Sequence, residues 1–272
     1  MRLVDKLTTL IRLLRTQGFA GIAEIIKQKI HPRRIYESVL EINKNGEGVV
    51  NMVDVGSVGG MPSEWLRHSH KIRFLLNFEP RDVPLVAGNI VTMNTALWSE
   101  NCTRDFYIYK GFEGSGSSLF MQNYDYVRQN WQKLKDRGPG DLAETWFNRS
   151  ELLRKEQLHC RTLDDVIAEQ TPGVAFDFMK IDAQGAEYEI LKGAERMLTG
   201  SCIGLHLELF VQPLYTGIHL LPEVEQFLSK MHFRLVKKFP PHGTFDSQHD
   251  CLFLKENVES PAVNAIREVY AL

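Results

Sequence analysis

Five short apolar runs, separated by helical stretches, constrain this chain more than any other feature. They span residues 49–56, 72–80, 89–97, 176–182 and 202–209, and β-branched or aromatic side chains are frequent in them. Runs that are apolar on both faces are typical of parallel strands covered by helices. Two further strands near the carboxyl end are joined by residues 240–249, a connection too short for a helical crossover, so these two strands should pair antiparallel. The pattern predicts an open, mostly parallel α/β sheet with one reversed strand.

Residues 99–160 interrupt this alternation. They contain a predicted strand pair, a loop rich in Gly and Ser, an aromatic segment through Trp131 and the breaker Gly-Pro-Gly at 138–140. Long insertions in compact domains are usually lids or binding loops, so we place substrate recognition here. A poorly ordered surface excursion is the alternative.

The first 48 residues form a separate segment, and the domain proper spans residues 49–272. Residues 1–34 carry eight basic and two acidic side chains, and their leucines and isoleucines recur at helical spacing. Two short amphipathic helices are therefore predicted. Such helices either pack on the domain as a cap or contact a membrane surface or a partner.

Composition excludes several other classes of protein. The formal net charge of −2 gives no reason to expect a nucleic-acid partner. The sequence contains no stretch of about 18 apolar residues, which a membrane-spanning helix would need. The four cysteines lie far apart, without the spacing of a zinc site, which favours a reducing compartment and a cytoplasmic location. The sequence does not determine the oligomeric state; a homodimer is compatible with it.

The turn after the first predicted strand is the strongest local motif. Residues 54–60 read DVGSVGG, with Asp54 in front of Gly56, Ser57 and Gly60. Glycines allow the backbone to approach a ligand closely, and the next helix would present free N–H groups. The spacing departs from the GxGxxG loop that holds a pyrophosphate, and an acid suits a positively charged ligand instead. A purely structural strand-to-helix turn is the alternative.

Two further residues extend this prediction to a nucleoside. Glu79 ends the second predicted strand, where a carboxylate can accept hydrogen bonds from both ribose hydroxyls. Asn94 follows the third run and is the expected neighbour of an adenine, although asparagine also forms turns.

Ionisable groups gather at the ends of the fourth and fifth runs. Asp182 ends one strand, Glu187 begins the next helix, and His206 and Glu208 share one face of the other strand. If these strands are neighbours, the four residues form an acid/base cluster facing the crevice, with Lys180 as an ion-pair partner for Asp182. Asp182, Glu187 and Glu208 could also bind a divalent cation, but no compact ligand motif is present and no metal is predicted.

Several motifs in this order resemble the FkbM family of methyltransferases. They are the DVGxxxG loop, FEP (78–80), Ala96-Leu97, TLDD (162–165), KIDxQGAExxxLKGA (180–194) and HLE…PLY (206–215). The resemblance covers about residues 49–255. It implies a Rossmann-like class I methyltransferase fold, with a seven-stranded sheet whose last strand is reversed. It implies S-adenosyl-L-methionine as the cofactor. It also implies O-methylation of a hydroxyl on a sugar, glycan or secondary metabolite. Val58 departs from the family, where the loop generally has Asn.

The resemblance and the residue analysis together yield one set of expected roles. A non-catalytic nucleoside-binding module of the same fold and a nicotinamide-dependent oxidoreductase are the alternative functions, the second disfavoured by the missing GxGxxG loop. The expected cofactor contacts are Asp54, Gly56, Ser57, Gly60, Glu79, Asn94, Ser117, Ser118 and Asp182; the expected acceptor contacts are Glu187 and Tyr215; the expected catalytic residues are Asp182, Glu208 and His206.

Overall fold

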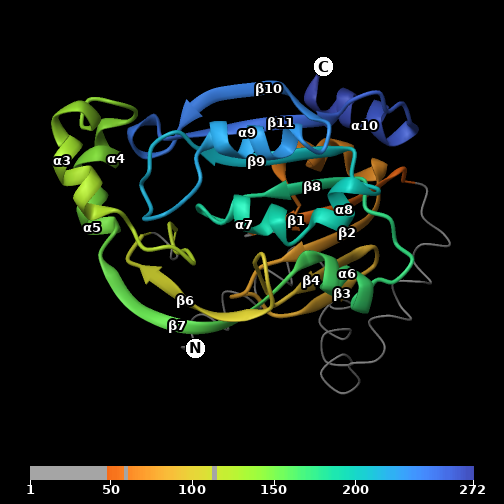
Figure 1. The fold of residues 1–272 in the computed structure, drawn as a ribbon, viewed down its shortest axis with the longest axis horizontal. Helices are drawn as coiled ribbons and strands as arrows, with labels where there is room; N and C mark the ends of the chain where they lie inside the picture. The colour runs from red at the N-terminus through yellow and green to blue at the C-terminus, as the bar shows by residue number, and fades with distance from the viewer. Residues whose placement is uncertain (1–47, 58–60, 112–114) are drawn as a thin grey trace.

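An eight-stranded sheet organises the part of the chain that the structure, a computed structural model, describes: residues 48–57, 61–111 and 115–272. The strand order is β10-β11-β9-β8-β1-β2-β4-β3 (Figure 1). The strands are β1 (Val50–Val55), β2 (Ile72–Phe78), β3 (Leu85–Ala87), β4 (Ile90–Met93), β8 (Phe178–Ile181), β9 (Gly204–Phe210), β10 (Phe233–His242) and β11 (Gln248–Lys255).

The strand directions confirm a mostly parallel sheet with a reversed last strand. β1 lies parallel between β2 and β8, β2 pairs parallel with β4, and β8 pairs parallel with β9. β11 runs antiparallel to both β9 and β10. The predicted count of seven strands is one too low because β3 forms a short antiparallel edge on β4. A turn through Gly88, which has a positive φ of 57°, joins these two strands.

Helices cover both faces of the sheet. One face packs against α6 (Leu163–Gln170), α7 (Glu187–Lys192), α8 (Glu195–Thr199) and α9 (Leu221–Ser229). The other face packs against the 3₁₀ helix η1 (Ser63–Lys71) and α10 (Pro261–Tyr270). Both faces of the central strands are thereby buried, as continuous apolar runs require.

Residues 187–199 form two short helices rather than one. α7 ends at Lys192 and α8 begins at Glu195. Gly193 lies at the break and packs closely against the chain, since a Cβ on it would lie 2.1 Å from the backbone oxygen of Trp98. One apolar stripe is nevertheless buried along both helices: Ala186, Ile190, Leu191, Ala194 and Leu198.

The segment between β4 and α6 leaves the main sheet. It forms a second, three-stranded sheet of β5 (Ala96–Leu97), β6 (Cys102–Tyr109) and β7 (Leu152–Arg161), with the order β5-β7-β6. Between β6 and β7 lie α3 (Tyr124–Leu134), α4 (Gly140–Glu144) and α5 (Trp146–Arg149). Figure 1 shows these helices at one end of the molecule, beyond the carboxyl ends of β8 and β9.

A small apolar core holds these inserted helices in place. Val127, Trp146 and Phe245 pack in it with Phe210, the last residue of β9, and with Tyr215, which follows β9. Phe245 lies in the short 3₁₀ helix η3 (Thr244–Asp246) between β10 and β11. The insertion is therefore packed against the connection between the last two strands.

The predicted amphipathic helices of residues 1–34 lie outside the described residues. The division of the chain at residue 48 stays a prediction for the same reason.

Candidate active site

The turn after β1 is held between the ends of two neighbouring strands. The Gly56 N–H donates to the Phe78 oxygen of β2 at 2.9 Å, and the Asp182 N–H donates to the Val55 oxygen at 3.0 Å. Gly56 has a φ of 79°, and a Cβ there would lie 1.9 Å from the backbone oxygen of Asp182. Only glycine combines this backbone conformation with this close approach.

A cavity of about 700 Å³ opens above this turn. It lies at the carboxyl ends of β1, β2, β8 and β9, where open α/β sheets bind their ligands. We name it the larger cavity. Among the described residues that line it are Asp54, Gly56, Ser57, Glu79, Thr95, Ala96, Leu97, Ser117, Lys180, Asp182, His206, Glu208 and Asp250.

Register explains why these polar groups meet. The parallel pairing places Asn77, Asp54, Lys180 and His206 in one row across four strands. The antiparallel pairing of β9 with β11 adds Asp250 opposite Glu208. Residues distant in sequence therefore share one edge of the sheet.

Polar atoms with unmet hydrogen-bonding capacity line the larger cavity. Asp54 Oδ1 and Ser57 Oγ are buried and have no hydrogen bond within the described part of the chain. A buried polar group without a partner costs about 1–3 kcal/mol, so a polar ligand is the natural partner for these atoms.

Asp54, the acid of the row across the four strands, is deeply buried, with 1% of its surface exposed. Burial raises the pKa of its carboxyl to about 7, and the Lys180 ammonium, 3.7 Å from Oδ1, offsets part of that effect. Burial also lowers the pKa of Lys180, but Asp54 and Asp182 outweigh it and the net shift is upward. Lys180 thus stays protonated between two carboxylates.

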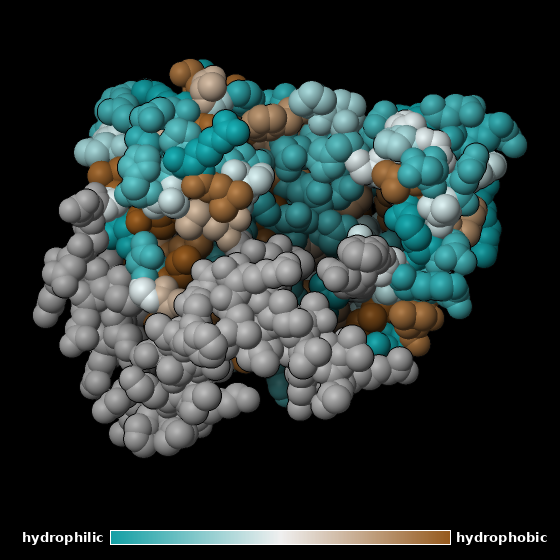
Figure 2. Space-filling view, turned by 180° about the vertical axis from the view of Figure 1, so that it is seen from behind, coloured by the Kyte–Doolittle hydropathy of each residue, from teal (hydrophilic) through white to brown (hydrophobic). Residues whose placement is uncertain are grey.

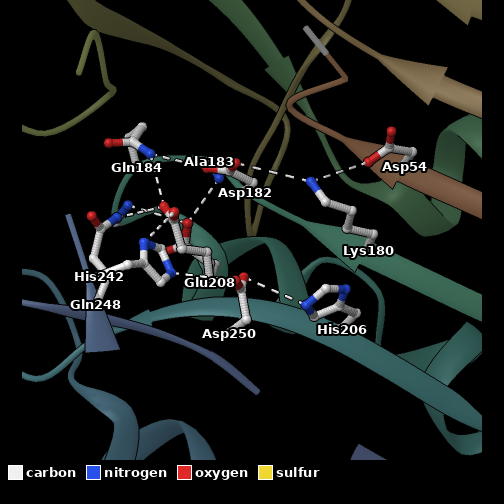
Figure 3. A network of polar contacts seen from close by, with 12 residues as sticks. Asp54, Lys180, Asp182, Ala183, Gln184, His206, Glu208, His242, Gln248 and Asp250 are labelled. Carbon is white, nitrogen blue, oxygen red and sulfur yellow. Dashed lines mark hydrogen bonds and ion pairs between the residues drawn. The ribbon is translucent and has the colours of Figure 1, made fainter. Parts of the chain in front are cut away.

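Glu208 sits at the centre of a polar network (Figure 3). The Gln184 amide donates to Glu208 Oε2 at 2.8 Å and to Asp182 Oδ1 at 2.9 Å, and the Gln248 amide also donates to Glu208 Oε2. Burial and then the nearby Asp182 charge raise the pKa of Glu208 well above its usual range. Once ionised, such a carboxylate is a stronger base than an exposed one.

Two histidines flank Asp250 beside this network. His242 Nε2 lies 3.3 Å and His206 Nε2 lies 3.4 Å from the Asp250 carboxylate. The two histidines lower the pKa of Asp250 despite its burial, and Asp250 in turn raises the pKa of His242. On its other side His206 Nδ1 lies 3.0 Å from the Tyr270 hydroxyl. His206 is therefore engaged at both ring nitrogens.

A second cavity, of about 300 Å³, adjoins the first. We name it the smaller cavity. The two share Ser115, Gly116, Gln184 and Glu208. The remaining walls of the smaller cavity come from α4, α5, the segment after β9 and the connection between β10 and β11. Glu208 is thus exposed to both cavities.

Most of the predicted residues lie where the sequence placed them. Asp54, Gly56, Ser57, Glu79, Ser117, Asp182, His206 and Glu208 line the larger cavity, and Tyr215 lines the smaller one. Glu79 Oε1 accepts hydrogen bonds from the Arg81 backbone and guanidinium, which fixes the carboxylate. Their roles toward a ligand stay predictions.

Three predicted residues point elsewhere. Asn94 is exposed and donates to the Asp82 oxygen at 2.6 Å, and residues 95–97 line the larger cavity in its place. The Ser118 hydroxyl is buried and donates to the Gln184 oxygen at 2.7 Å. Glu187 is buried as well, because its carboxylate accepts the N–H groups of Ala183 and Gly185. It stabilises the turn and lines neither cavity.

The position of Glu187 also bears on the metal alternative. Within the described residues, no group of three or more His, Cys, Asp or Glu side chains could hold a metal ion. Asp182 and Glu208 lie together, but Glu187 is turned away from them into the interior.

Gly60, expected to contact the cofactor, lies outside the described residues.

Four residues of the site are not predicted from the sequence: Gln184, His242, Gln248 and Asp250. Gln184 lies within the KIDxQGAE motif, which was the available signal. The other three belong to β10 and β11 and have no motif of their own. Only the antiparallel register brings them beside Glu208.

Glu187 yields a prediction on stability. Burial raises the pKa of its carboxyl to about 7 although backbone N–H groups partly oppose this. Because the folded pKa lies above the unfolded one, Glu187 makes the protein less stable as pH rises through this interval. The unfolding free energy of wild type should fall between about pH 5 and pH 8, and that of Glu187→Gln should fall by roughly 2–3 kcal/mol less. Urea denaturation at the two pH values measures the difference.

Glu195→Gln is the matched control because Glu195 is exposed in the first turn of the neighbouring helix α8. It should follow the wild-type pH dependence. Identical pH dependence of Glu187→Gln and wild type would contradict the assignment.

The described residues contain no helix long and apolar enough to cross a membrane. The face in Figure 2 is mainly hydrophilic where it is described, with hydrophobic residues gathered in small patches. The expected membrane or partner contact of residues 1–34 stays a prediction.

Comparison with known proteins identifies the domain type. Residues 77–235, more than half of the chain, match the family described as Methyltransferase FkbM domain. No curated protein sequence matches the chain.

Solved structures resemble it more distantly. The methyltransferase FkbM from Methylobacillus flagellatus KT is 14% identical with a TM-score of 0.42, over 75% of this chain and 43% of that one. Magnesium protoporphyrin IX methyltransferase (ChlM) from Synechocystis PCC 6803, with bound SAM, is 13% identical with a TM-score of 0.35, over 91% and 96%. This chain thus spans less than half the length of the first structure, and similarity this low transfers no substrate.

Proposed function

The chain belongs to the FkbM family of S-adenosyl-L-methionine-dependent methyltransferases, and we propose that it methylates a hydroxyl oxygen of a small-molecule or glycan acceptor. The observation that carries the proposal is Glu208, a largely buried carboxylate with a raised pKa that faces both cavities. An alcohol must lose its proton as the new bond to oxygen forms, so a hydroxyl acceptor needs a base at the point of transfer.

The residues of the larger cavity fit the cofactor. Bound S-adenosylmethionine supplies a methyl group already activated by a positively charged sulfur. The turn at Gly56 leaves room for a ligand against the backbone, and Asp54 Oδ1 and Ser57 Oγ are the buried atoms without hydrogen bonds there. We assign Asp54 and Ser57 to the amino-acid part, together with Ser117, and Glu79 to the ribose hydroxyls. Residues 95–97 take the place expected of Asn94 beside the adenine.

The base is proposed to be Glu208 rather than Asp182 or His206. Asp182 is paired with a cation, since its carboxylate lies 3.9 Å from the Lys180 ammonium. His206 faces Tyr270 and Asp250 through its two nitrogens. Glu208 would take the hydroxyl proton, while Gln184 orients its carboxylate and that of Asp182.

Replacing Glu79 with alanine should weaken binding of S-adenosylhomocysteine by about 1–3 kcal/mol, the scale of lost charge-assisted hydrogen bonds. Isothermal titration calorimetry measures this directly. Glu100→Ala, which removes an exposed acid that lines neither cavity, is the control. Equal affinity of Glu79→Ala and wild type would remove Glu79 from the cofactor site.

The function is tested by incubating the full chain with isotope-labelled S-adenosylmethionine and a panel of hydroxylated acceptors. Mass spectrometry should detect one added methyl group, and NMR should locate it on oxygen. A methyl group on nitrogen or carbon would contradict O-methylation. Absence of S-adenosylhomocysteine binding at high protein concentration would contradict cofactor use altogether.

A further inference from the structure

The smaller cavity has the properties of a binding site. Gln122 Oε1 and Ser247 Oγ are buried without a hydrogen bond to any described residue, and both residues line this cavity. Gln122 is 6% exposed and Ser247 is fully buried. The Gln122 oxygen can only accept a hydrogen bond, whereas the Ser247 hydroxyl can donate or accept. A ligand with several hydroxyl groups would supply a hydrogen-bond partner to both atoms.

The walls of the smaller cavity suit a sugar-like ring. Trp146, Phe210 and Tyr215 line it and are buried, so their positions are fixed by packing. The Tyr215 hydroxyl donates to the Gly116 oxygen at 2.8 Å, which ties this wall to the loop shared with the larger cavity. Aromatic faces beside polar groups are common in sites for small polar ligands.

Arg149 places a positive charge in the same wall. Its guanidinium donates to the Leu142 oxygen at 2.8 Å and to the hydroxyls of Thr145 and Thr244 at 3.0 and 2.9 Å. Each of these partners is uncharged. Glu208 is the one acid among the described lining residues. A guanidinium without a carboxylate partner among the described residues favours an anion. Because Nε and Nη2 make the three hydrogen bonds above, Nη1 is the nitrogen that would donate to it.

The position of the cavity connects binding with chemistry. Glu208 and Gln184 line both cavities, so a molecule in the smaller cavity reaches the proposed base at one end. Arg149 belongs to α5 and Glu208 to β9, so the charge and the base come from different elements.

We propose that the smaller cavity is the acceptor site and that it binds a polyhydroxylated molecule carrying a carboxylate or phosphate group, which Arg149 recognises. This inference rests on the proposed methyltransferase function, because the shared residues matter only if methyl transfer occurs between the cavities.

The test measures binding of three probes to the full chain saturated with S-adenosylhomocysteine, by ligand-observed NMR. The probes are methyl glucuronide, glucose 6-phosphate and neutral methyl glucoside, which separate a carboxylate from a phosphate and both from an uncharged sugar. At least one anionic probe should bind about tenfold or more tightly than the neutral one. Arg149→Gln should abolish this preference, and Arg149→Lys should restore part of it.

Arg128→Gln is the matched control, since Arg128 lies on inserted helix α3, is largely exposed and lines neither cavity. It should keep the preference. Retained S-adenosylhomocysteine binding shows that each variant is folded.

The inference is overturned if S-adenosylhomocysteine binds but no anionic probe is preferred, or if Arg149→Gln keeps the preference. Absence of S-adenosylhomocysteine binding to the wild-type chain would instead overturn the proposed function.

Discussion

Replacing Glu208 with glutamine should lower turnover by about 10²–10⁴-fold, the range that a general base contributes. Glutamine keeps an oxygen that can accept from Gln184 and Gln248, so the network is preserved while the basic group is lost. Binding of S-adenosylhomocysteine should change little. Single-turnover kinetics with saturating cofactor measures the effect.

The pH profile gives the second readout of Glu208. A base must be ionised, so the wild-type rate should rise with pH through the raised pKa of Glu208 and then level off. Glu208→Gln should lose this rise. Glu225→Gln, an exposed acid on α9, should behave as wild type. Undiminished turnover of Glu208→Gln, with a larger loss in Asp182→Asn, would transfer the role to Asp182.

Replacing Gly56 with alanine should abolish tight cofactor binding and destabilise the fold. The positive φ alone costs a residue with a side chain about 1–2 kcal/mol. The added Cβ would also lie 1.9 Å from the backbone oxygen of Asp182, so either the turn or the end of β8 must shift. Because Asp54 and Asp182 flank this contact, affinity for S-adenosylhomocysteine should fall by at least about tenfold.

Gly173→Ala separates the two effects. Gly173 has a φ of 82°, close to that of Gly56, but a Cβ there would meet no atom within 4 Å. This variant should lose only the stability due to φ and should bind S-adenosylhomocysteine like wild type. Thermal unfolding and calorimetry distinguish the two variants. Equal losses in both would show that the contact with Asp182 carries no weight.

The mostly parallel sheet and the strand-end acids could be predicted because each depends on local sequence. Apolar runs mark the strands, and Asp54, Asp182 and Glu208 stand at or near their carboxyl ends. Once parallel order is assumed, these ends must meet at one edge of the sheet. The same logic could not find β3, whose three residues are too few to show a period.

Side-chain direction explains why some predicted residues do not line the cavities. Glu187 begins a helix beside the crevice, as expected, but its carboxylate turns back to the N–H groups of residues 183 and 185. Asn94 is one residue before the segment that lines the larger cavity. Helix and strand periodicity do not resolve such local hydrogen bonding.

Long-range packing explains why the sequence does not reveal the smaller cavity. Arg149 donates to Thr244, and Trp146 packs near Phe245, about a hundred positions further along the chain. No motif connects the inserted helices with the turn between β10 and β11. This contact forms through the small apolar core around Phe245, which has no sequence period.

The two cavities draw on different parts of the fold, and this division has an evolutionary consequence. The larger cavity is built mainly from strand ends and their turns, whereas the smaller one is built largely from α4, α5 and the β10–β11 connection. Peripheral segments of this kind tolerate replacement better than a sheet core does. Donor use can therefore be inherited unchanged while acceptor preference diverges. For an engineer, exchanging residues 124–150 together with 242–248 between homologues is the most direct route to a retargeted enzyme.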